Sequence, residues 1–486
     1  MNDMQFTDFA FLFGFLPAVF LLYWLYFQKH AANLFLVIVS LLFYGWGSVH
    51  SLLILILILC WNYAACRMIG LLQDAENQSE RKKTLSRFSA GQILIIAIAG
   101  DLLILSVYRY LPGFLSLSGS ASLQKRAAGI FTMPIGLSFY LFSCISALAD
   151  IYMQKEKVCS MKDFALFAAF FGWVNMGPIA HYRNLAPQLD HHPMTRKNLK
   201  KGAALFIQGL SFKVILSNNL GLVFSGLSAN TTWLGTLLLN FSYFLMIYFD
   251  FAGYSRMARG LGAFFGFDIP KNFDEPYLAL SVQDFWRRWH ISLTSWFRDY
   301  VYIPLGGNRV RRRRWILNVM AVWLLTGIWH GFGLSFVIWG LLQGALILLE
   351  KLVLSDRMKH WPRALLHSWV VFWELIGWTL FSSASLTTGL ERIVRMSGIL
   401  STGFCDGPAL FYLKNAAFLL FVCVLIISRM DLILISIVRR SVSGPSVQKF
   451  DQRWRTLVNT AYIFSFAICL IFEISSTAQT FLYAVF

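Results

Sequence analysis

A segment rich in polar and charged residues, 250–309, lies within a chain that is otherwise strongly apolar. Ionisable groups at membrane depth are costly unless they face a protein interior or a watery cavity, so a dense set of them predicts a functional site. A further histidine follows in the apolar sequence LLTGIWHGFG. The chemically capable groups of this region are Asp284, Arg287, Arg288, His290, Arg298, Asp299 and His330.

His290 and His330 have the side chain best suited to proton transfer at neutral pH, because an imidazole has an ordinary pKa near ~6.5. A hydroxyl is a poor nucleophile, and an imidazole that takes its proton makes it a better one. This chemistry needs no metal or redox cofactor. The seven cysteines form no CxxC pair, and no histidine stands at metal-ligand spacing, so we expect no bound metal.

Each of these residues also has a structural explanation. His330 alone could be hydrogen-bonded across a helix bundle, and His290 could brace a re-entrant turn. The arginines Arg287, Arg288 and Arg298 are suited to an anionic ligand such as a phosphate group, but snorkelling to the membrane interface explains them as well.

Three neighbouring features complete the candidate site. Trp329 precedes His330 and is included among the substrate-binding candidates. Asp250 ends an apolar run, where we expect it to make a buried hydrogen bond, and it is included as a donor-binding candidate. The basic run 309–314 is interpreted as an anchor on the cytoplasmic side.

Composition indicates an integral membrane protein, with 57% hydrophobic and only 14% charged residues in a chain of 486. We attribute the net charge of +18 to cytoplasmic loops, and not to nucleic-acid binding. The N-terminus lacks the basic region of a cleavable signal peptide, so its first apolar stretch is expected to remain as a span.

Apolar runs predict about ten to twelve membrane crossings by the length rule. Two of the runs, 163–180 and 315–328, are short enough to be re-entrant. The runs lie near 9–27, 33–48, 50–72, 90–112, 130–151, 163–180, 202–227, 232–251, 315–328, 332–353, 365–384, 409–428 and 456–474.

The basic loops give the orientation of the first spans. If the loop with Arg81, Lys82, Lys83 and Arg87 is cytoplasmic, then Lys29 and the loop 155–162 lie on that side and the N-terminus lies outside. We see no fixed-period repeat and no soluble domain, so residues 1–486 are interpreted as a single membrane domain.

Several long motifs, in order, carry a resemblance. The sequences FDFAGYS, NFDEPYLALSVQDFWRRWHISLTSWFRDYVYIPLGGNR and TGIWHG are similar to those of the membrane-bound O-acyltransferase family, and most of all to its bacterial alginate O-acetyltransferase branch. The likeness covers most of residues 7–350, with a motif-bearing core at about 130–350. It thins over the C-terminal helices in 365–486. The teichoic-acid D-alanylation branch shares FWRRWH.

The resemblance implies an all-α polytopic fold, with short or re-entrant helices around a central tunnel, and acyl transfer to a hydroxyl with His330 and His290 as catalytic residues. It also implies acetyl-CoA as the donor with no permanently bound cofactor, the bacterial inner membrane as location, and a separate extracytoplasmic lipase-like partner of hydrolase fold. Two positions depart from the family pattern. Arg256 stands where an acidic residue is common, and Gln343 where a further histidine is common.

We therefore expect a membrane O-acetyltransferase acting for an extracytoplasmic polysaccharide such as alginate, cellulose or peptidoglycan. D-alanyl transfer to teichoic acid is the second enzyme hypothesis. A transporter of an acylated intermediate is the non-enzymatic one, although we see no inverted repeats that would favour it. For the enzyme, we expect a pocket lined by Trp329, His330, His290 and aromatic residues of 285–300.

Overall fold

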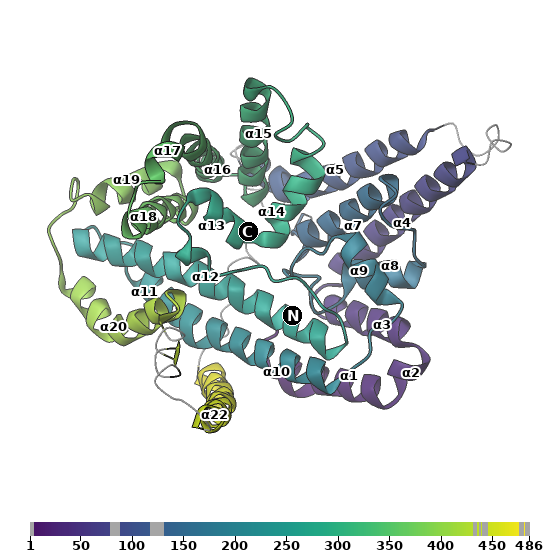
Figure 1. Ribbon diagram of the computed structural model, residues 1–486, viewed down its shortest axis with the longest axis horizontal. Coiled ribbons are helices and arrows are strands. Elements are labelled where there is room, and N and C mark those ends of the chain that lie inside the picture. The colour runs from purple at the N-terminus through teal and green to yellow at the C-terminus, as the bar shows by residue number, and fades with distance from the viewer. Residues whose placement is uncertain are drawn as a thin grey trace. The chain divides into compact units, whose positions relative to one another are not determined.

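Helices make up the regular structure of the chain, and none of the residues described here lies in a β-strand (Figure 1). The predicted all-α, polytopic class is confirmed. The computed structural model describes residues 4–77, 88–116, 131–430, 435–436, 439, 446–475 and 481. The basic residues Arg81, Lys82, Lys83 and Arg87, used above to orient the chain, lie outside these ranges.

Eight helices in the described ranges are long and apolar enough to cross a membrane, two fewer than the lower bound of the predicted count. Two shorter apolar helices, Ala32–Gly45 and Leu137–Tyr152, come in addition. The eight candidate spans are Ala10–His30, Val49–Ala75, Ala90–Leu115, Trp233–Phe264, Leu334–Met358, Arg363–Phe381, Gly407–Ile427 and Gln452–Ile474.

The chain is divided into two compact units. The first consists of Met1–Ala203, Met257–Lys271 and Ser295–Pro304, and the second of Ala204–Arg256, Asn272–Thr294 and Leu305–Phe486. Because α10 (Arg196–Ser211), α12 (Trp233–Phe264) and α14 (Ile291–Phe297) run through unit boundaries, both units include parts of these helices.

The first unit is built from the N-terminal helices. The pair α4 and α5 lies side by side, and α7 packs against both (Figure 1). The helix α8 is only nine residues long, as expected for a short element, and it packs on α3. The helices of this unit are η1 (Ala10–Phe15), α1 (Leu16–Leu22), η2 (Tyr23–Phe27), α2 (Gln28–His30), α3 (Ala32–Gly45), α4 (Val49–Asn77), α5 (Ala90–Ser116), α7 (Leu137–Tyr152), α8 (Met161–Ala169), α9 (Tyr182–Leu189) and η5 (Arg298–Tyr302).

The second unit holds both histidines of the candidate site. Its helices are η3 (Phe212–Ser217), α11 (Asn218–Gly226), η4 (Pro276–Leu278), α13 (Val282–Arg288), α15 (Arg312–His330), α16 (Leu334–Leu349), η6 (Glu350–Leu354), α17 (Ser355–Met358), α18 (Arg363–Phe381), α19 (Leu386–Met396), α20 (Gly407–Ile427) and α22 (Ser446–Ser475).

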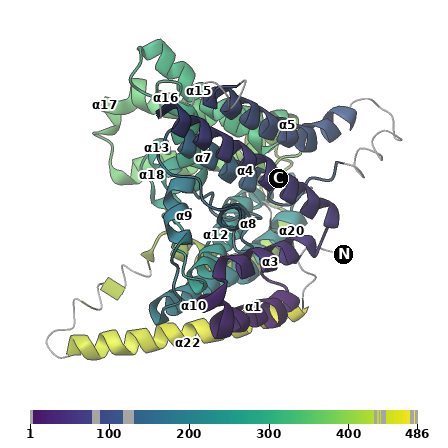
Figure 2. The same cartoon turned by 90° about the vertical axis from the view of Figure 1, so that its right-hand side faces the viewer.

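Glycines let α15 and α16 approach at backbone distance (Figures 1 and 2). A Cβ added to Gly340 would stand 2.4 Å from the carbonyl oxygen of Trp323, and one on Gly344 would meet the Trp323 side chain at 3.0 Å. A Cβ on Gly327 would stand 2.5 Å from the Phe336 carbonyl oxygen. Small residues four positions apart on one helix face, here Gly340 and Gly344, allow such a close contact. It fixes the helix that ends at His330.

Candidate active site

The short helix α13 carries the FWRR motif and is capped by its own sequence. The Ser281 hydroxyl accepts a hydrogen bond from the Asp284 backbone N–H at 3.0 Å. An acidic residue then occupies the first turn, and Arg287 and Arg288 occupy the last, so the charges complement the helix dipole. The helix ends at Arg288; Trp289 has an extended backbone, and His290 follows.

His290 sits in a constrained loop conformation. Its φ of 44° lies in the left-handed region, which costs energy for a residue other than glycine and often marks functional positions. The Asn272 side-chain oxygen accepts hydrogen bonds from His290 Nδ1 at 3.1 Å, from the Ser292 N–H at 3.1 Å and from the Ser292 hydroxyl at 2.9 Å. Because Nδ1 donates to an oxygen, the neutral ring keeps its lone pair on Nε2.

Burial determines the charge of His290, which lies outside the eight candidate spans. Its side chain is 2% exposed, and burial lowers its pKa to about 3. The ring is therefore neutral at physiological pH.

His330 is the last residue of α15 and is 3% exposed. Its ring centroid lies 4.5 Å from that of Trp329, 5.1 Å from Trp339 and 5.0 Å from Phe381. The Trp329 ring also lies 6.3 Å from the His290 ring. The structure thus brings both predicted histidines and Trp329 together.

Gln343 occupies the position at which the resembling family commonly has a histidine. Its side-chain oxygen accepts a hydrogen bond from the Trp286 indole N–H at 3.0 Å, and its amide nitrogen donates to Glu374 at 3.4 Å. The amide therefore works as a bridge between α13 and α18. Sequence reasoning missed Glu374, although a lone acidic residue in an apolar span is itself a signal.

The three candidate arginines differ in their partners. Arg288 pairs with Asp284 at 3.0 Å, and Arg298 pairs with Asp299 at 2.6 Å. Arg287 is exposed, and the described residues show no carboxylate paired with it. The donor-binding role of the three arginines stays a prediction.

Asp250 is engaged by a lysine that sequence reasoning did not pair with it. Lys213 Nζ lies 2.8 Å from the Asp250 carboxylate, and the Ser217 hydroxyl donates to the same oxygen at 3.3 Å. The lysine and aspartate side chains are 3% and 1% exposed. Arg256, the other departure from the family pattern, lies over the Phe212 ring at 4.4 Å. The buried hydrogen bond expected for Asp250 is confirmed, and its donor-binding role stays a prediction.

A second polar cluster lies in the first unit, and the sequence analysis named only its members Arg298 and Asp299. Arg183 bridges two carboxylates, with Asp150 at 3.3 Å and Asp299 hydrogen-bonded on its other side. Burial raises the pKa of Asp299, but hydrogen bonds from Arg298 and Arg183 outweigh it and hold the pKa below its ordinary value. His181 lies 3.5 Å from Asp299, and its pKa is lowered by burial and by Arg183.

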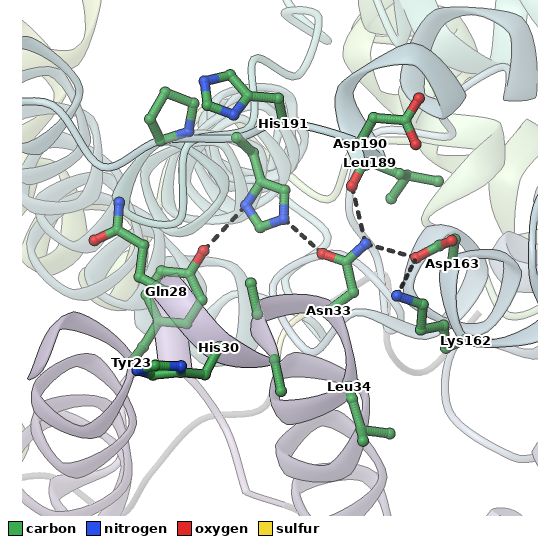
Figure 3. A pocket seen from close by; sticks show the side chains of 14 residues that line it. Tyr23, Gln28, His30, Asn33, Leu34, Lys162, Asp163, Leu189, Asp190 and His191 are labelled. Carbon is green, nitrogen blue, oxygen red and sulfur yellow. Dashed lines mark hydrogen bonds and ion pairs between the residues drawn. The ribbon is translucent and has the colours of Figure 1, made fainter. Parts of the chain in front are cut away.

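A pocket of about 460 Å³ in the first unit is lined by several polar side chains (Figure 3). His192 is one of the lining residues and is buried. Its Nε2 lies 2.6 Å from the Asn33 oxygen and its Nδ1 3.1 Å from the Tyr23 hydroxyl, and the Asn33 amide donates to Asp163 at 2.6 Å. These polar groups are hydrogen-bonded to one another, which is typical of a structural role.

A second pocket, of about 650 Å³, is lined by residues such as Arg67, Asp74 and Lys155 of the same unit. Neither pocket is lined by His290 or His330, so the pocket expected around them stays a prediction. Among the residues that the structure describes, no group of three or more His, Cys, Asp or Glu side chains is arranged to hold a metal ion.

Comparison of the sequence with known proteins identifies a family and several relatives to which this chain is similar. The sequence model of the membrane-bound O-acyltransferase family matches residues 102–389. The probable alginate O-acetylase of Pseudomonas syringae pv. tomato is 36% identical over 394 residues, which are 79% of this chain and 73% of that protein. The peptidoglycan O-acetyltransferase of Helicobacter pylori is 31% identical over 438 residues, 81% and 80% of the two chains. The teichoic acid D-alanyltransferase of Bacillus subtilis is 30% identical over 230 residues, 44% and 58% of the two chains.

Proposed function

The chain belongs to the membrane-bound O-acyltransferase family, and from that premise we propose that it moves an acetyl group from cytoplasmic acetyl-CoA across the membrane for O-acetylation of an extracytoplasmic polysaccharide. It is a multi-pass membrane O-acyltransferase. The named activities of its relatives support acetyl as the group and a glycan as the final acceptor.

In the proposed transfer, the acyl group leaves the sulfur of a thioester and joins the oxygen of an acceptor hydroxyl. That hydroxyl belongs to the final acceptor or to an intermediate acyl carrier. The acceptor hydroxyl attacks the thioester carbonyl, its proton passes to an imidazole nitrogen, the carbon–sulfur bond breaks, and the thiolate takes a proton to leave as a thiol. In this proposal His330 receives the proton. Its place beside Trp329, at the end of a helix locked to α16, gives it a fixed position.

His290 has a different role in the proposal. A ring whose pKa is lowered to about 3 accepts a hydrogen bond but takes up a proton poorly at neutral pH. With Nδ1 committed to Asn272, Nε2 would orient the acceptor hydroxyl. The exposed Arg287 would receive the donor phosphates.

The surroundings of the reaction belong to the same proposal. We place the chain in the bacterial inner membrane, with a separate extracytoplasmic hydrolase-fold protein that relays the acetyl group to the polysaccharide. The 34–36% identity of several alginate O-acetylases over about four fifths of this chain supports this arrangement. The peptidoglycan relative supports a cell-wall acceptor instead.

The observation that carries the proposal is the meeting of the two motif histidines at the Trp329 ring. The test is mass spectrometry of envelope glycans from cells with and without the chain. Acetyl esters should disappear from one glycan when the chain is removed and return when it is restored. Loss of D-alanyl esters from teichoic acid, with acetylation intact, would overturn the acetyl assignment.

A further inference from the structure

The amino end of α13 is held by a residue far away in the sequence. The Glu350 carboxylate accepts hydrogen bonds from the backbone N–H groups of Val282 at 2.8 Å and Gln283 at 3.2 Å. These are the first two residues of α13, whose N–H groups have no partner within the helix itself. A third donor, the Trp369 indole N–H, reaches the same carboxylate at 3.0 Å.

The carboxyl end of α13 is held by local contacts. The Asp274 N–H donates to the Arg288 carbonyl at 2.9 Å, and the Ile291 N–H donates to the Asn272 carbonyl at 2.9 Å. Asn272 also holds the ring of His290. The segment from α13 to His290 is thus fixed at both ends, and at its amino end the hydrogen-bond acceptor comes from another helix, because Glu350 is the first residue of η6.

Burial of the Glu350 carboxylate costs free energy unless hydrogen bonds compensate for the loss of water. Its side chain is 6% exposed, and it lies within the candidate span Leu334–Met358. A buried carboxylate is tolerated when its oxygens are satisfied by hydrogen bonds, and the positive end of a helix dipole adds to their strength. Here three donors meet two oxygens, and two of the donors belong to the element that carries the catalytic motif.

We propose that Glu350 is a positioning residue that holds α13 so that His290 stays beside Trp329. This rests on the proposed function, because positioning matters only if His290 serves acyl transfer. Glu350 touches no reacting group and acts through the seven-residue helix. A shift of its amino end would be carried to His290, whose left-handed backbone leaves little freedom to compensate.

The first arm of the test measures whether Glu350 fixes the amino end of α13, independently of activity. Hydrogen exchange with mass spectrometry on the full chain in detergent compares wild type, Glu350→Gln and Trp369→Phe. Glu350→Gln keeps one acceptor oxygen but turns an N–H₂ group toward the helix, so exchange over 282–292 should rise. Trp369→Phe removes only the third donor, so it should leave that segment protected.

The second arm measures transfer of radiolabelled acetyl from acetyl-CoA. We take roughly 10–100-fold as the expected effect, which is the loss seen when a residue that orients a metal ligand is removed. We expect kcat to fall by this factor in Glu350→Gln with the donor KM unchanged, because alignment is lost and ground-state binding is not. In a His290→Gln background, the same change should add little.

The outcomes separate the two proposals. Unchanged hydrogen exchange over 282–292 in Glu350→Gln would show that Glu350 does not fix the amino end of α13. Raised exchange with unchanged kcat would overturn the positioning role. Full additivity with His290→Gln would show that Glu350 acts elsewhere. If wild type transfers no acetyl group, the proposed function fails, while the exchange comparison still decides whether Glu350 holds the helix.

Discussion

His290 and His330 share Trp329 as an aromatic neighbour, and the proposed function gives the two histidines different roles. His290 is tied through Nδ1 to Asn272, whereas His330 ends a helix among the rings of Trp329, Trp339 and Phe381. The motif alone gives no basis for telling proton acceptor from orienting group. For His290 the structure adds a tautomer, which follows from its hydrogen-bond partner, and a lowered pKa, which follows from burial.

Replacing His330 tests the proton acceptor. His330→Ala should reduce acyl transfer by roughly 10²–10⁴-fold, the usual contribution of general-base catalysis. The exposed His360, in the loop after α17, provides the matched control, and His360→Ala should transfer at the wild-type rate. Activity per folded molecule is measured after gel filtration in detergent. Wild-type transfer by His330→Ala would remove His330 from the mechanism.

Replacing Arg287 tests donor binding. Arg287→Gln should raise the KM for acetyl-CoA with little change in kcat, which is the pattern of lost ground-state binding. Arg357 is exposed on α17 and serves as control, because Arg357→Gln removes the same charge elsewhere. Steady-state kinetics over donor concentration provide the measurement. Equal KM values in wild type and Arg287→Gln would favour snorkelling as the reason for this arginine.

His290 should leave a signature in the pH dependence of stability. Its pKa is lowered in the fold, so below pH ~6.5 the unfolded chain binds a proton that the folded chain refuses until about pH 3. Stability is therefore lost as pH falls through this window, by about 2 kcal/mol between pH 7 and pH 5. Thermal unfolding should show a smaller pH effect in His290→Gln. Equal pH effects in both proteins would mean that His290 titrates normally.

At the scale of elements, the buried ion pair between η3 and α12 shows what sequence patterns leave out. Asp250 was visible as a charge at the end of an apolar run, but its partner Lys213 lies 37 residues earlier in another helix. Likewise, the length of α13 and its cap could be expected from SVQDFWRR, whereas Glu350 and Gln343 as its holders could not. Local capping is encoded by neighbours in the sequence, and contacts between helices depend on tertiary packing.

Breaking the Lys213–Asp250 pair should cost much more than breaking an exposed one. Lys213→Met leaves a carboxylate that is 1% exposed without its cation, and we expect a loss of about 3 kcal/mol in stability. Lys213→Met combined with Asp250→Leu should recover most of it. Lys201→Met is the control, because its pair with Asp268 is exposed and worth less than about 1 kcal/mol. Denaturation in detergent measures all four proteins, and equal losses for the two lysine variants would contradict the argument.

At the scale of the whole molecule, composition and motif order were sufficient for the helical class and the family. Apolar runs long enough to cross a bilayer are visible in the sequence, and the motifs span a region that the family comparison also matches. Among the described residues, eight helices are candidate spans and two shorter apolar helices come in addition. The run at 163–180, expected to be short, gives a nine-residue helix, and the run at 202–227 gives a succession of α10, η3 and α11.

A two-compartment assay tests the whole molecule as an enzyme that joins the two sides of a membrane. The chain is reconstituted in sealed vesicles with a membrane-impermeant oligosaccharide and any purified extracytoplasmic partner inside, and acetyl-CoA outside. An acyltransferase of the proposed kind should form acetyl esters inside only, and His330→Ala should form none, because donor and acceptor must meet at one imidazole. A transporter would deliver an acylated intermediate without forming the ester, and its activity would survive the loss of His330. Ester formation that requires donor and acceptor on the same side would contradict transfer across the membrane while leaving acyl transfer itself intact.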